Sequence, residues 1–344
     1  MKTRNLIALL LIGILLYSNN QVFAQDDAAS SFLGMWALTL DYEDNTAGWL
    51  EVTQKEGYLY SELLWRWGSV TPVDFTMIFV GDLLLINGRD VVRERDDEGE
   101  PVITQHPVSW YDVGMNGDDQ IIGEASFPNG DGIEFETVSF TGKRIPPIGE
   151  APNLKKIKYG EAIALFNGKD ISNWKIIGAN NANGWKVEDG ILINDPVQKS
   201  GEEHISYGNL RTTDTFEDFN LKVEVNIPAG SNGGIYLRGN YEVQVVDSYG
   251  SELDPHNMGA LYSRITPLVA AENPGGEWQE MDITLYKRHL TVKLNGKLLI
   301  DNQPVKGVTG GALNSDDFSP GPIYLQGDHG EISYRKLVLT PILN

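Results

Sequence analysis

The stretch Gly233–Asp247 reads GGIYLRGNYEVQVVD and predicts a β-hairpin. Two short runs of alternating side chains, Ile235–Arg238 and Tyr241–Val246, flank the pair Gly239 and Asn240, which is typical of a turn. In each run the apolar side chains fall on one face. The opposite face carries an unusual polar set, namely Tyr236, Arg238, Glu242 and Gln244.

The length of the turn decides whether this polar set comes together. A two-residue turn places Arg238 across from Tyr241 and separates the two polar groups. A three-residue loop with a glycine bulge places Arg238 across from Glu242 and unites them. In that register we expect a cation, a carboxylate and an amide on one face, a mixture that suits a polyhydroxylated ligand. The alternative is a solvated strand face with an incidental Arg–Glu pair.

Short alternating runs bounded by Gly, Asn, Asp and Pro recur along the 344 residues, whereas stripes of helical period are scarce. The sequence therefore predicts an all-β protein, and its length suggests two domains. Pro146, Pro147 and Pro152 indicate a stiff linker. We expect an N-terminal domain over 25–143, a proline-rich linker over 144–158 and a second domain over 159–344.

Strand signals are strongest in the second domain, where Asn295 and Gly296 indicate a tight hairpin turn. About a dozen short strands without a helix predict two stacked sheets, as in a sandwich or jelly roll. The clearest strands are expected at Phe219–Ile227, Gly234–Leu237, Tyr241–Val246, Met281–Lys287, His289–Leu294, Lys297–Ile300 and Ile332–Leu339.

The N-terminal domain resembles a small calycin-type β-barrel in its pattern of strands. Its tryptophans either line a ligand cavity or fill the barrel core, and they are Trp36, Trp65, Trp67 and Trp110. Eight strands are expected, at Gly34–Leu40, Gly48–Gln54, Tyr58–Trp67, Phe75–Val80, Asp82–Asn87, Val102–Tyr111, Gln120–Ala125 and Ile133–Gly142.

Residues 1–24 have the features of a cleaved export signal. Lys2 and Arg4 precede the apolar run Leu6–Leu16, and a small residue, Ala24, stands where cleavage is expected. The run is shorter than the roughly 20 residues of a spanning helix, so we expect no membrane span. The chain has no Cys, which excludes a lipobox, disulfides and thiolate chemistry. We expect an exported protein, periplasmic or extracellular.

The charge balance is strongly acidic. The formal net charge is −21, and removal of the two basic residues of the signal makes it −23. Nucleic acid and anionic lipid both need a basic surface, so neither is expected as a partner. Neutral sugars and divalent cations remain compatible with this charge. The residues give no indication of an oligomeric state.

Several phrases of the second domain resemble one family. The phrases span Leu165–Trp174, Gly184–Gly190, Phe216–Phe219, Gly233–Asp247, Gly276–Trp278, Leu294–Gly296 and Ile323–Gly330. Their order is similar to that of the 3-keto-disaccharide hydrolase family, also described as 3-keto-glucoside 1,2-lyase and 3-keto-2-hydroxy-glucal hydratase. The resemblance covers 159–342 and none of 25–158. It implies a concanavalin-like jelly roll.

The resemblance also implies a reaction. A ketone at C3 acidifies the proton on C2, so a base removes that proton, the enolate expels the group at C1, and water then adds. This chemistry needs a base, a stabiliser for the enolate oxygen and groups that orient the ring. An ordinary glycosidase instead needs two facing carboxylates. Glu242 and Asp247 fall on opposite faces by alternation, which favours elimination.

On this basis the expected catalytic residues are His329 and Glu242 as bases and Arg238 as the oxyanion stabiliser. The expected substrate-binding residues are Gln244, Gln326, Asp247, Tyr262, His256 and Tyr236. The resemblance also allows a divalent cation (Ca, Mg or Mn) held by Glu242, Asp247 or His329. Bland alternatives stand beside these roles: a structural loop histidine for His329, and a turn cap for Asp247.

The leading hypothesis is an exported enzyme that cleaves 3-keto-glycosides or 3-keto-disaccharides, with a 3-keto-glucoside as its partner. The alternative is a non-catalytic, lectin-like jelly roll, which needs aromatic platforms and amides but no base. A conventional glycosidase would need two carboxylates across one cleft.

Overall fold

The computed structural model describes residues 29–44, 46–88, 91–95, 101–105, 108–128, 134–178, 182–198 and 205–343, with backbone only for 91–95 and 101–105. The predicted export signal lies outside the described residues. The chain separates into two compact units. The first contains most of the chain up to Pro146. The second contains Pro147 onward together with two earlier segments, Asn45–Gly48 and Leu64–Val70.

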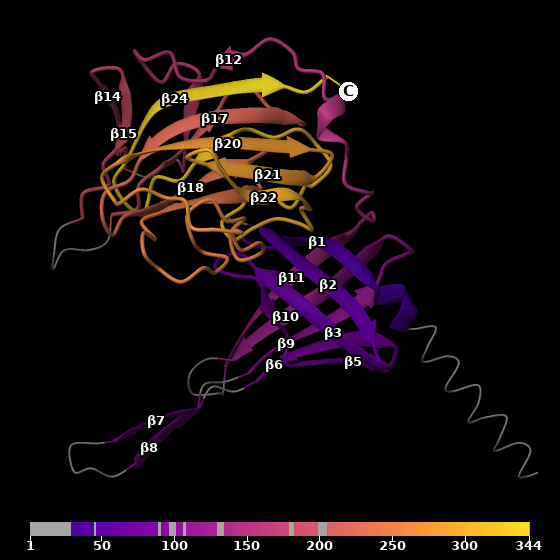
Figure 1. Cartoon of the computed structure of the whole chain (residues 1–344). Coiled ribbons are helices and arrows are strands. Elements are labelled where there is room, and N and C mark those ends of the chain that lie inside the picture. Colours follow the sequence, from indigo (N-terminus) through magenta and orange to yellow (C-terminus); the bar gives the residue numbers. More distant parts are fainter. Residues whose placement is uncertain are drawn as a thin grey trace, which may run out of the picture. The chain divides into compact units, whose positions relative to one another are not determined.

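The first unit is built on one curled nine-stranded sheet (Figure 1), in the order β4-β3-β2-β1-β11-β10-β9-β6-β5. Its core includes Trp36 of the first strand and Trp49 of the second, and both side chains are fully buried. The strands are β1 Gly34–Leu40, β2 Ala47–Lys55, β3 Tyr58–Trp65, β4 Thr71–Pro72, β5 Phe75–Phe79, β6 Asp82–Asn87, β9 Ser109–Met115, β10 Gln120–Pro128 and β11 Phe135–Ile145.

Two expectations for this unit need correction. The single strand predicted at Val102–Tyr111 is wrong, because β8 (Pro101–Gln105, paired with β7, Val91–Arg95) ends before β9 begins. Pro107 between them has no amide hydrogen for a ladder. The four tryptophans also do not share one location, in a cavity or in the barrel core. Trp36 is a core residue, whereas Trp67 is 55% exposed and belongs to the second unit.

The second unit is a sandwich of two sheets (Figure 1). The larger has the order β14-β15-β24-β17-β20-β21-β22, with β12 beside β24, and the smaller has the order β13-β16-β23-β18-β19. The strands of the larger sheet are β12 Ile163–Ala164, β14 Trp185–Glu188, β15 Ile191–Asn194, β17 Phe219–Asn226, β20 Trp278–Tyr286, β21 His289–Leu294, β22 Lys297–Pro304 and β24 Ile332–Pro341. Those of the smaller are β13 Trp174–Ile177, β16 Asn209–Thr212, β18 Asn232–Leu237, β19 Tyr241–Val246 and β23 Tyr324–Leu325; one 3₁₀ turn, η1, spans Leu154–Lys156.

Alternating side chains build the core between these two sheets. β17 contributes Leu221 and Val223, and the smaller sheet contributes Leu210, Ile235 and Val243, all fully buried in one hydrophobic cluster. The predicted all-β, jelly-roll sandwich is therefore confirmed. The alternate apolar side chains of β18 and β19 point into this core. The polar side chains between them must therefore point to the other side of the smaller sheet.

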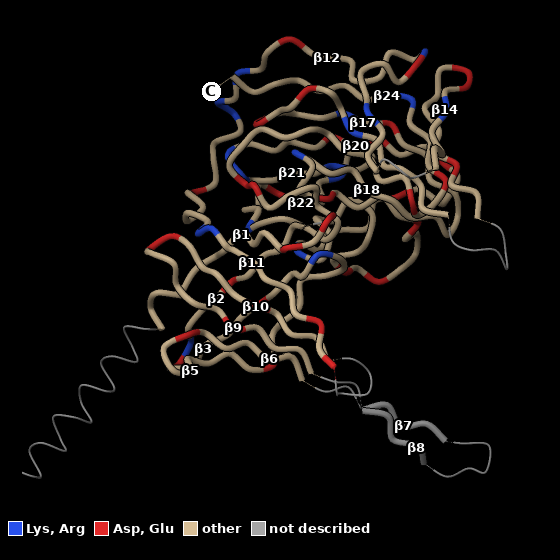
Figure 2. Tube along the Cα trace, turned by 180° about the vertical axis from the view of Figure 1, so that it is seen from behind, with Lys and Arg blue, Asp and Glu red and all other residues tan. Residues whose placement is uncertain are grey.

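The charges and the few helices complete the description. Lys and Arg, blue in Figure 2, are scattered among the more numerous Asp and Glu, 27 against 48 in the whole sequence. Within the part of the chain that the structure describes, no helix has the length and apolar character needed to cross a membrane.

Candidate active site

The hairpin of β18 and β19 turns through three residues, Arg238, Gly239 and Asn240. Leu237 stands opposite Tyr241, and Tyr236 opposite Glu242. The predicted pairing of Arg238 with Glu242 is therefore wrong, since the loop begins one residue earlier than expected.

The cause of this register lies at Tyr241 and the turn. Tyr241 is a buried strand residue whose hydroxyl donates to Asp317 Oδ1 at 2.8 Å, so it cannot serve as part of the loop. The turn also requires left-handed backbone at Arg238 (φ 55°) and Gly239 (φ 71°). The polar face consequently consists of Tyr236, Glu242 and Gln244, and Arg238 is not part of it.

Arg238 has a different set of partners. Its guanidinium donates to the carbonyl of Asp317 at 2.9 Å and to the carbonyl of Ser319 at 3.1 and 2.5 Å, and the residue is 4% exposed. A fork of donors that closes on backbone carbonyls fixes the loop beside the turn. The structure thus gives Arg238 contacts typical of a loop anchor.

Glu242 lies at the centre of the polar face and is almost wholly buried, with 3% exposure. The Tyr236 hydroxyl is 3.0 Å from Glu242 Oε2 and 2.8 Å from the carbonyl oxygen of Gly310, so it can donate to either. Burial raises the pKa of Glu242 to about 8, and the Tyr236 hydrogen bond opposes this only in part. Glu242 therefore changes charge close to neutral pH. The predicted alternative of a solvated strand face is wrong.

Tyrosines surround this carboxyl. The rings of Tyr236 and Tyr324 stack with centroids 4.3 Å apart. Burial raises the pKa of both hydroxyls, and the charge of Glu242 raises each further. Tyr262 donates its backbone N–H to the Glu242 carbonyl at 3.0 Å. Hydroxyls with raised pKa values stay protonated at neutral pH, so they remain hydrogen-bond donors beside Glu242.

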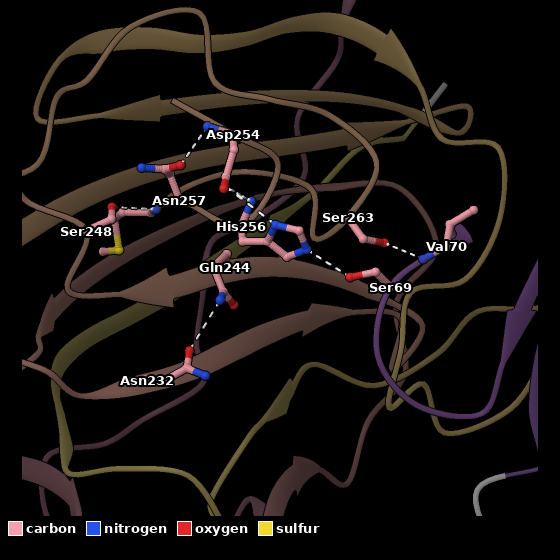
Figure 3. A network of polar contacts seen from close by, with 10 residues as sticks. Ser69, Val70, Asn232, Gln244, Ser248, Asp254, His256, Asn257 and Ser263 are labelled. Atoms are coloured by element: carbon pink, nitrogen blue, oxygen red, sulfur yellow. Dashed lines mark hydrogen bonds and ion pairs between the residues drawn. The ribbon is translucent and has the colours of Figure 1, made fainter. Parts of the chain in front are cut away.

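Gln244 is the adjacent member of the polar face and is 3% exposed. Its amide donates to Asn232 Oδ1 at 3.2 Å (Figure 3). The same amide turned by 180° donates to Glu242 Oε1 at 3.2 Å and to the Gly233 carbonyl at 3.0 Å. Gly234 leaves room for this arrangement, because a Cβ there would collide with the Glu242 carboxyl. Gln244 therefore links the carboxyl to the half-buried Asn232.

His256 belongs to the loop that runs beside β19. Its Nε2 lies 2.8 Å from Ser69 Oγ, and its Nδ1 lies 3.5 Å from Asp254 Oδ1 (Figure 3). The ring also meets Tyr262 edge-on, with centroids 5.0 Å apart. The loop is held against the sheet by backbone hydrogen bonds between Gln244 and the segment 259–260. His256 and Tyr262 thus border the polar face.

The other predicted residues have separate places. Gln326 donates its backbone N–H to the Gly234 carbonyl at 3.0 Å and is half-buried, so it extends the polar face. Asp247 follows β19, and its Oδ2 accepts the Gly230 N–H at 2.9 Å, as a turn cap does. His329 is exposed in the loop after β23, next to Gly330, which packs against Asn232 at the start of β18.

Comparison with known proteins gives the family. A family profile described as a 3-keto-alpha-glucoside-1,2-lyase-like domain matches residues 161–340, just over half of the chain. The chain belongs to this family. Membership confirms the resemblance drawn from 159–342 and indicates a carbohydrate-active enzyme. A search of curated proteins found no match.

Solved structures similar to this member of the 3-keto-alpha-glucoside-1,2-lyase-like family include two putative glycosyl hydrolases from Parabacteroides distasonis. One shares 29% identity, covers 57% of this chain and 92% of its own, and has a TM-score of 0.43. The other shares 21% identity over 53% and 94% of the two chains, with a TM-score of 0.42. β-Agarase B from Zobellia galactanivorans shares 10% identity over 58% and 98%, with a TM-score of 0.34.

The residues proposed to hold a divalent cation do not converge. Among the residues that the structure describes, no three His, Asp or Glu side chains are grouped so as to hold a metal ion. Asp247 caps its own turn, and His329 lies in an exposed loop. The set Glu242, Asp247 and His329 therefore does not fit Ca, Mg or Mn.

Sequence reasoning missed several residues that line the polar face. Tyr324 could have been found from the sequence, because it stands two residues before Gln326 and alternation along an extended chain puts both side chains on the same side. No such signal pointed to Asn232 or Gly310. Ser69 could not be predicted from the sequence, because no local pattern links it to His256, nearly two hundred residues further along the chain.

A hollow of about 420 Å³ lies elsewhere in this family member. It is lined by residues of the outer face of the larger sheet, including Asn220, Asp282 and Thr291. None of the predicted site residues borders it. We place the candidate site at Glu242 because the titratable group and the hydrogen-bond donors converge there.

Proposed function

We propose that this protein cleaves 3-keto-glycosides by elimination, with Glu242 as the base that removes the proton from C2. The observation that carries the proposal is the buried Glu242 carboxyl, whose pKa is raised to about 8 among neutral donors. A proton transfer group works best when its pKa lies near the working pH. A ketone at C3 makes the C2 proton acidic enough for such a base.

The neighbours of Glu242 suit the remaining needs of the reaction. The hydroxyls of Tyr236 and Tyr324 keep their protons, so they can donate to an enolate oxygen as it gains charge. The amides of Gln244 and Gln326 suit the hydroxyls of a sugar ring. We therefore assign stabilisation of the enolate to tyrosine hydroxyls, in place of the Arg238 guanidinium, which is held by carbonyls.

The proton balance closes at Glu242. The C2–H bond breaks and its proton moves to the carboxylate, the electron pair forms the enolate, and the bond from C1 to the leaving oxygen then breaks. Protonated Glu242 holds that proton at neutral pH, since its pKa is about 8, and can return it to the leaving oxygen. Water then adds to the unsaturated product. We assign His329, exposed beside Gly330, to this hydration step in place of the role of base at C2 expected from the sequence.

Two-carboxylate hydrolysis has less support. The carboxylates Asp247 and Asp317 lie near the two ends of β19, and each accepts a structural hydrogen bond, from Gly230 and Tyr241 respectively. A glycosidase needs a second carboxyl facing the first across the sugar. The tyrosines and amides around Glu242 fit elimination better.

The test incubates the purified protein with a 3-keto-glucoside and, separately, with the parent glucoside. We expect release of the aglycone from the keto form alone, and its loss in Glu242→Gln. His329→Ala should slow the appearance of the hydrated sugar while leaving aglycone release in place. Binding of both sugars without turnover of either would support the carbohydrate-binding alternative instead.

A further inference from the structure

The segment Arg66–Val70 lies upstream of the family domain in sequence but belongs to the same compact unit. Four contacts fix it there. The Arg66 carbonyl accepts the Gly311 N–H at 3.1 Å, and Ser69 Oγ lies 2.8 Å from His256 Nε2. The Val70 N–H donates to Ser263 Oγ at 3.1 Å (Figure 3). The backbones of Gly68 and Gly310 are so close that a Cβ on Gly310 would collide with Gly68.

These contacts place the Trp67 side chain beside Tyr236. A Cβ built on Gly311 would lie 2.8 Å from the Tyr236 hydroxyl oxygen and 3.9 Å from the Trp67 ring. The indole and the hydroxyl that reaches Glu242 therefore flank one glycine. Trp67 is nonetheless 55% exposed, whereas Tyr236 and Glu242 are buried. The Arg66 guanidinium lies 5.9 Å from the centroid of the Trp67 ring, and the ring still leaves more than half of its surface open to a ligand beside this buried polar centre.

Trp67 lies near the turn of the hairpin, at the end away from the Gln244 amide. The segment 309–313 lies against the turn of the hairpin, because the backbone N–H of Thr309 donates to the Asn240 carbonyl and that of Leu313 to the Gly239 carbonyl. Gln244 lies on the opposite side of Glu242, toward the start of β18. Glu242 is thus bordered by amides on one side and by the indole of Trp67 on the side of the turn.

We propose that Trp67 is a substrate-binding residue that stacks on the ring of the leaving group, so that the preferred substrates are 3-keto-glycosides whose aglycone is a neutral sugar or another ring. This inference rests on the proposed function. A base at C2 must lie next to C1, so the keto ring occupies the amide side and the leaving group extends toward Trp67. The flat face of an indole suits the apolar C–H face of a pyranose. Ser69 and His256 act as positioning residues for the segment.

The test compares two substrates that share the keto ring, a methyl 3-keto-glucoside and a 3-keto-disaccharide. Trp67→Ala should raise KM for the disaccharide about tenfold and change the methyl glycoside less than about twofold, the size expected for one aromatic contact. Trp67→Phe should recover most of the loss. Tyr249→Ala is the matched control, because Tyr249 is 59% exposed in the same unit and is not among the residues assigned to the site. Equal effects on both substrates, or none, would overturn the inference.

A second measurement does not depend on turnover. Calorimetric binding of the unoxidised parent disaccharide to the full-length protein should weaken about tenfold in Trp67→Ala and remain unchanged in Tyr249→Ala. If the wild-type protein turns over neither keto substrate while this difference persists, the elimination reaction fails and the stacking site stands. If turnover is present and the binding difference is absent, the reverse holds.

Discussion

At the scale of single residues, the site depends on one carboxyl whose environment makes it titrate near neutral pH. Glu242 obtains its raised pKa from burial, and Tyr236 offsets only part of the effect. The same burial that makes Glu242 a stronger base also keeps much of it protonated at pH 7. Its catalytic and its structural behaviour should therefore vary with pH over the same range.

The first prediction concerns activity. In the wild-type protein, kcat/KM for a 3-keto-glucoside should rise with pH and level off above about 8, because only the carboxylate accepts the C2 proton. Glu242→Gln should lower kcat/KM by at least about 100-fold and abolish this rise. Initial rates between pH 5.5 and 9.5 provide the measurement. A flat wild-type profile would count against Glu242 as the base.

The second prediction concerns stability. The pKa of the Glu242 carboxyl is 4.5 in its ordinary state and about 8 in the folded protein. Between pH 4.5 and about 8 the folded state therefore binds more protons than the unfolded state. The free energy of unfolding must then fall as pH rises from about 4.5 to 8, by an amount on the order of a few kcal/mol. The variant Glu242→Gln has no carboxyl at this position, so it lacks this pH-dependent contribution to the free energy of unfolding. Urea denaturation at pH 5 and 8.5 should show a larger loss for the wild type than for the variant, and parallel losses would contradict it.

At the scale of elements, glycines let backbone and side chains approach around the hairpin. The third prediction uses Gly310, whose added Cβ would collide with the backbone of Gly68. Gly310→Ala should displace the segment Arg66–Val70 and raise KM for a 3-keto-disaccharide about as much as Trp67→Ala. Gly149→Ala serves as a steric control, since a Cβ there meets no atom within 4 Å and its backbone is not left-handed. An unchanged KM in Gly310→Ala would show that the segment does not depend on this contact.

The hairpin also shows how far sequence reasoning reaches. Alternation correctly put Tyr236, Glu242 and Gln244 on one face, because the apolar residues between them have to enter the core. It did not set the register, which depends on Tyr241 bonding to Asp317 and on Arg238 bonding to carbonyls in the same loop. Such contacts join residues almost eighty positions apart, and no local pattern reports them.

At the scale of the whole molecule, fold class was predictable and the composition of the site was predictable only in part. Strand periodicity and turn residues predicted the all-β class, and the number of short strands predicted the sandwich, in agreement with the fold that the family phrases imply. The sequence pattern does not reveal burial, so it allows Glu242 to be a surface strand residue, whereas the structure leaves Glu242 only 3% exposed. Nothing in the sequence separated Trp67 from the other three tryptophans of its set, although it alone among the four is exposed.

The fourth prediction concerns export. If residues 1–24 are a cleaved signal, protein recovered from the periplasm or medium of a bacterial host should begin at Gln25. Mass spectrometry of the intact protein gives the mass of the chain, and its difference from the mass of the full sequence identifies the first residue. Replacing Leu10 and Leu11 with Asp should leave the protein uncleaved in the cytoplasm, because the apolar core would be interrupted. Recovery of an uncleaved chain outside the cell would contradict the signal.

The close approach of Gly68 to Gly310 has a consequence for how substrate range can diverge. The residues of the proposed proton chemistry lie inside 161–340, whereas the proposed contact with the leaving group lies in a five-residue segment upstream of it. Changes within that segment can alter which aglycones are accepted while the residues around Glu242 stay the same. Two relatives with identical family domains can therefore differ in specificity, and a protein trimmed to its family domain should lose selectivity before it loses chemistry.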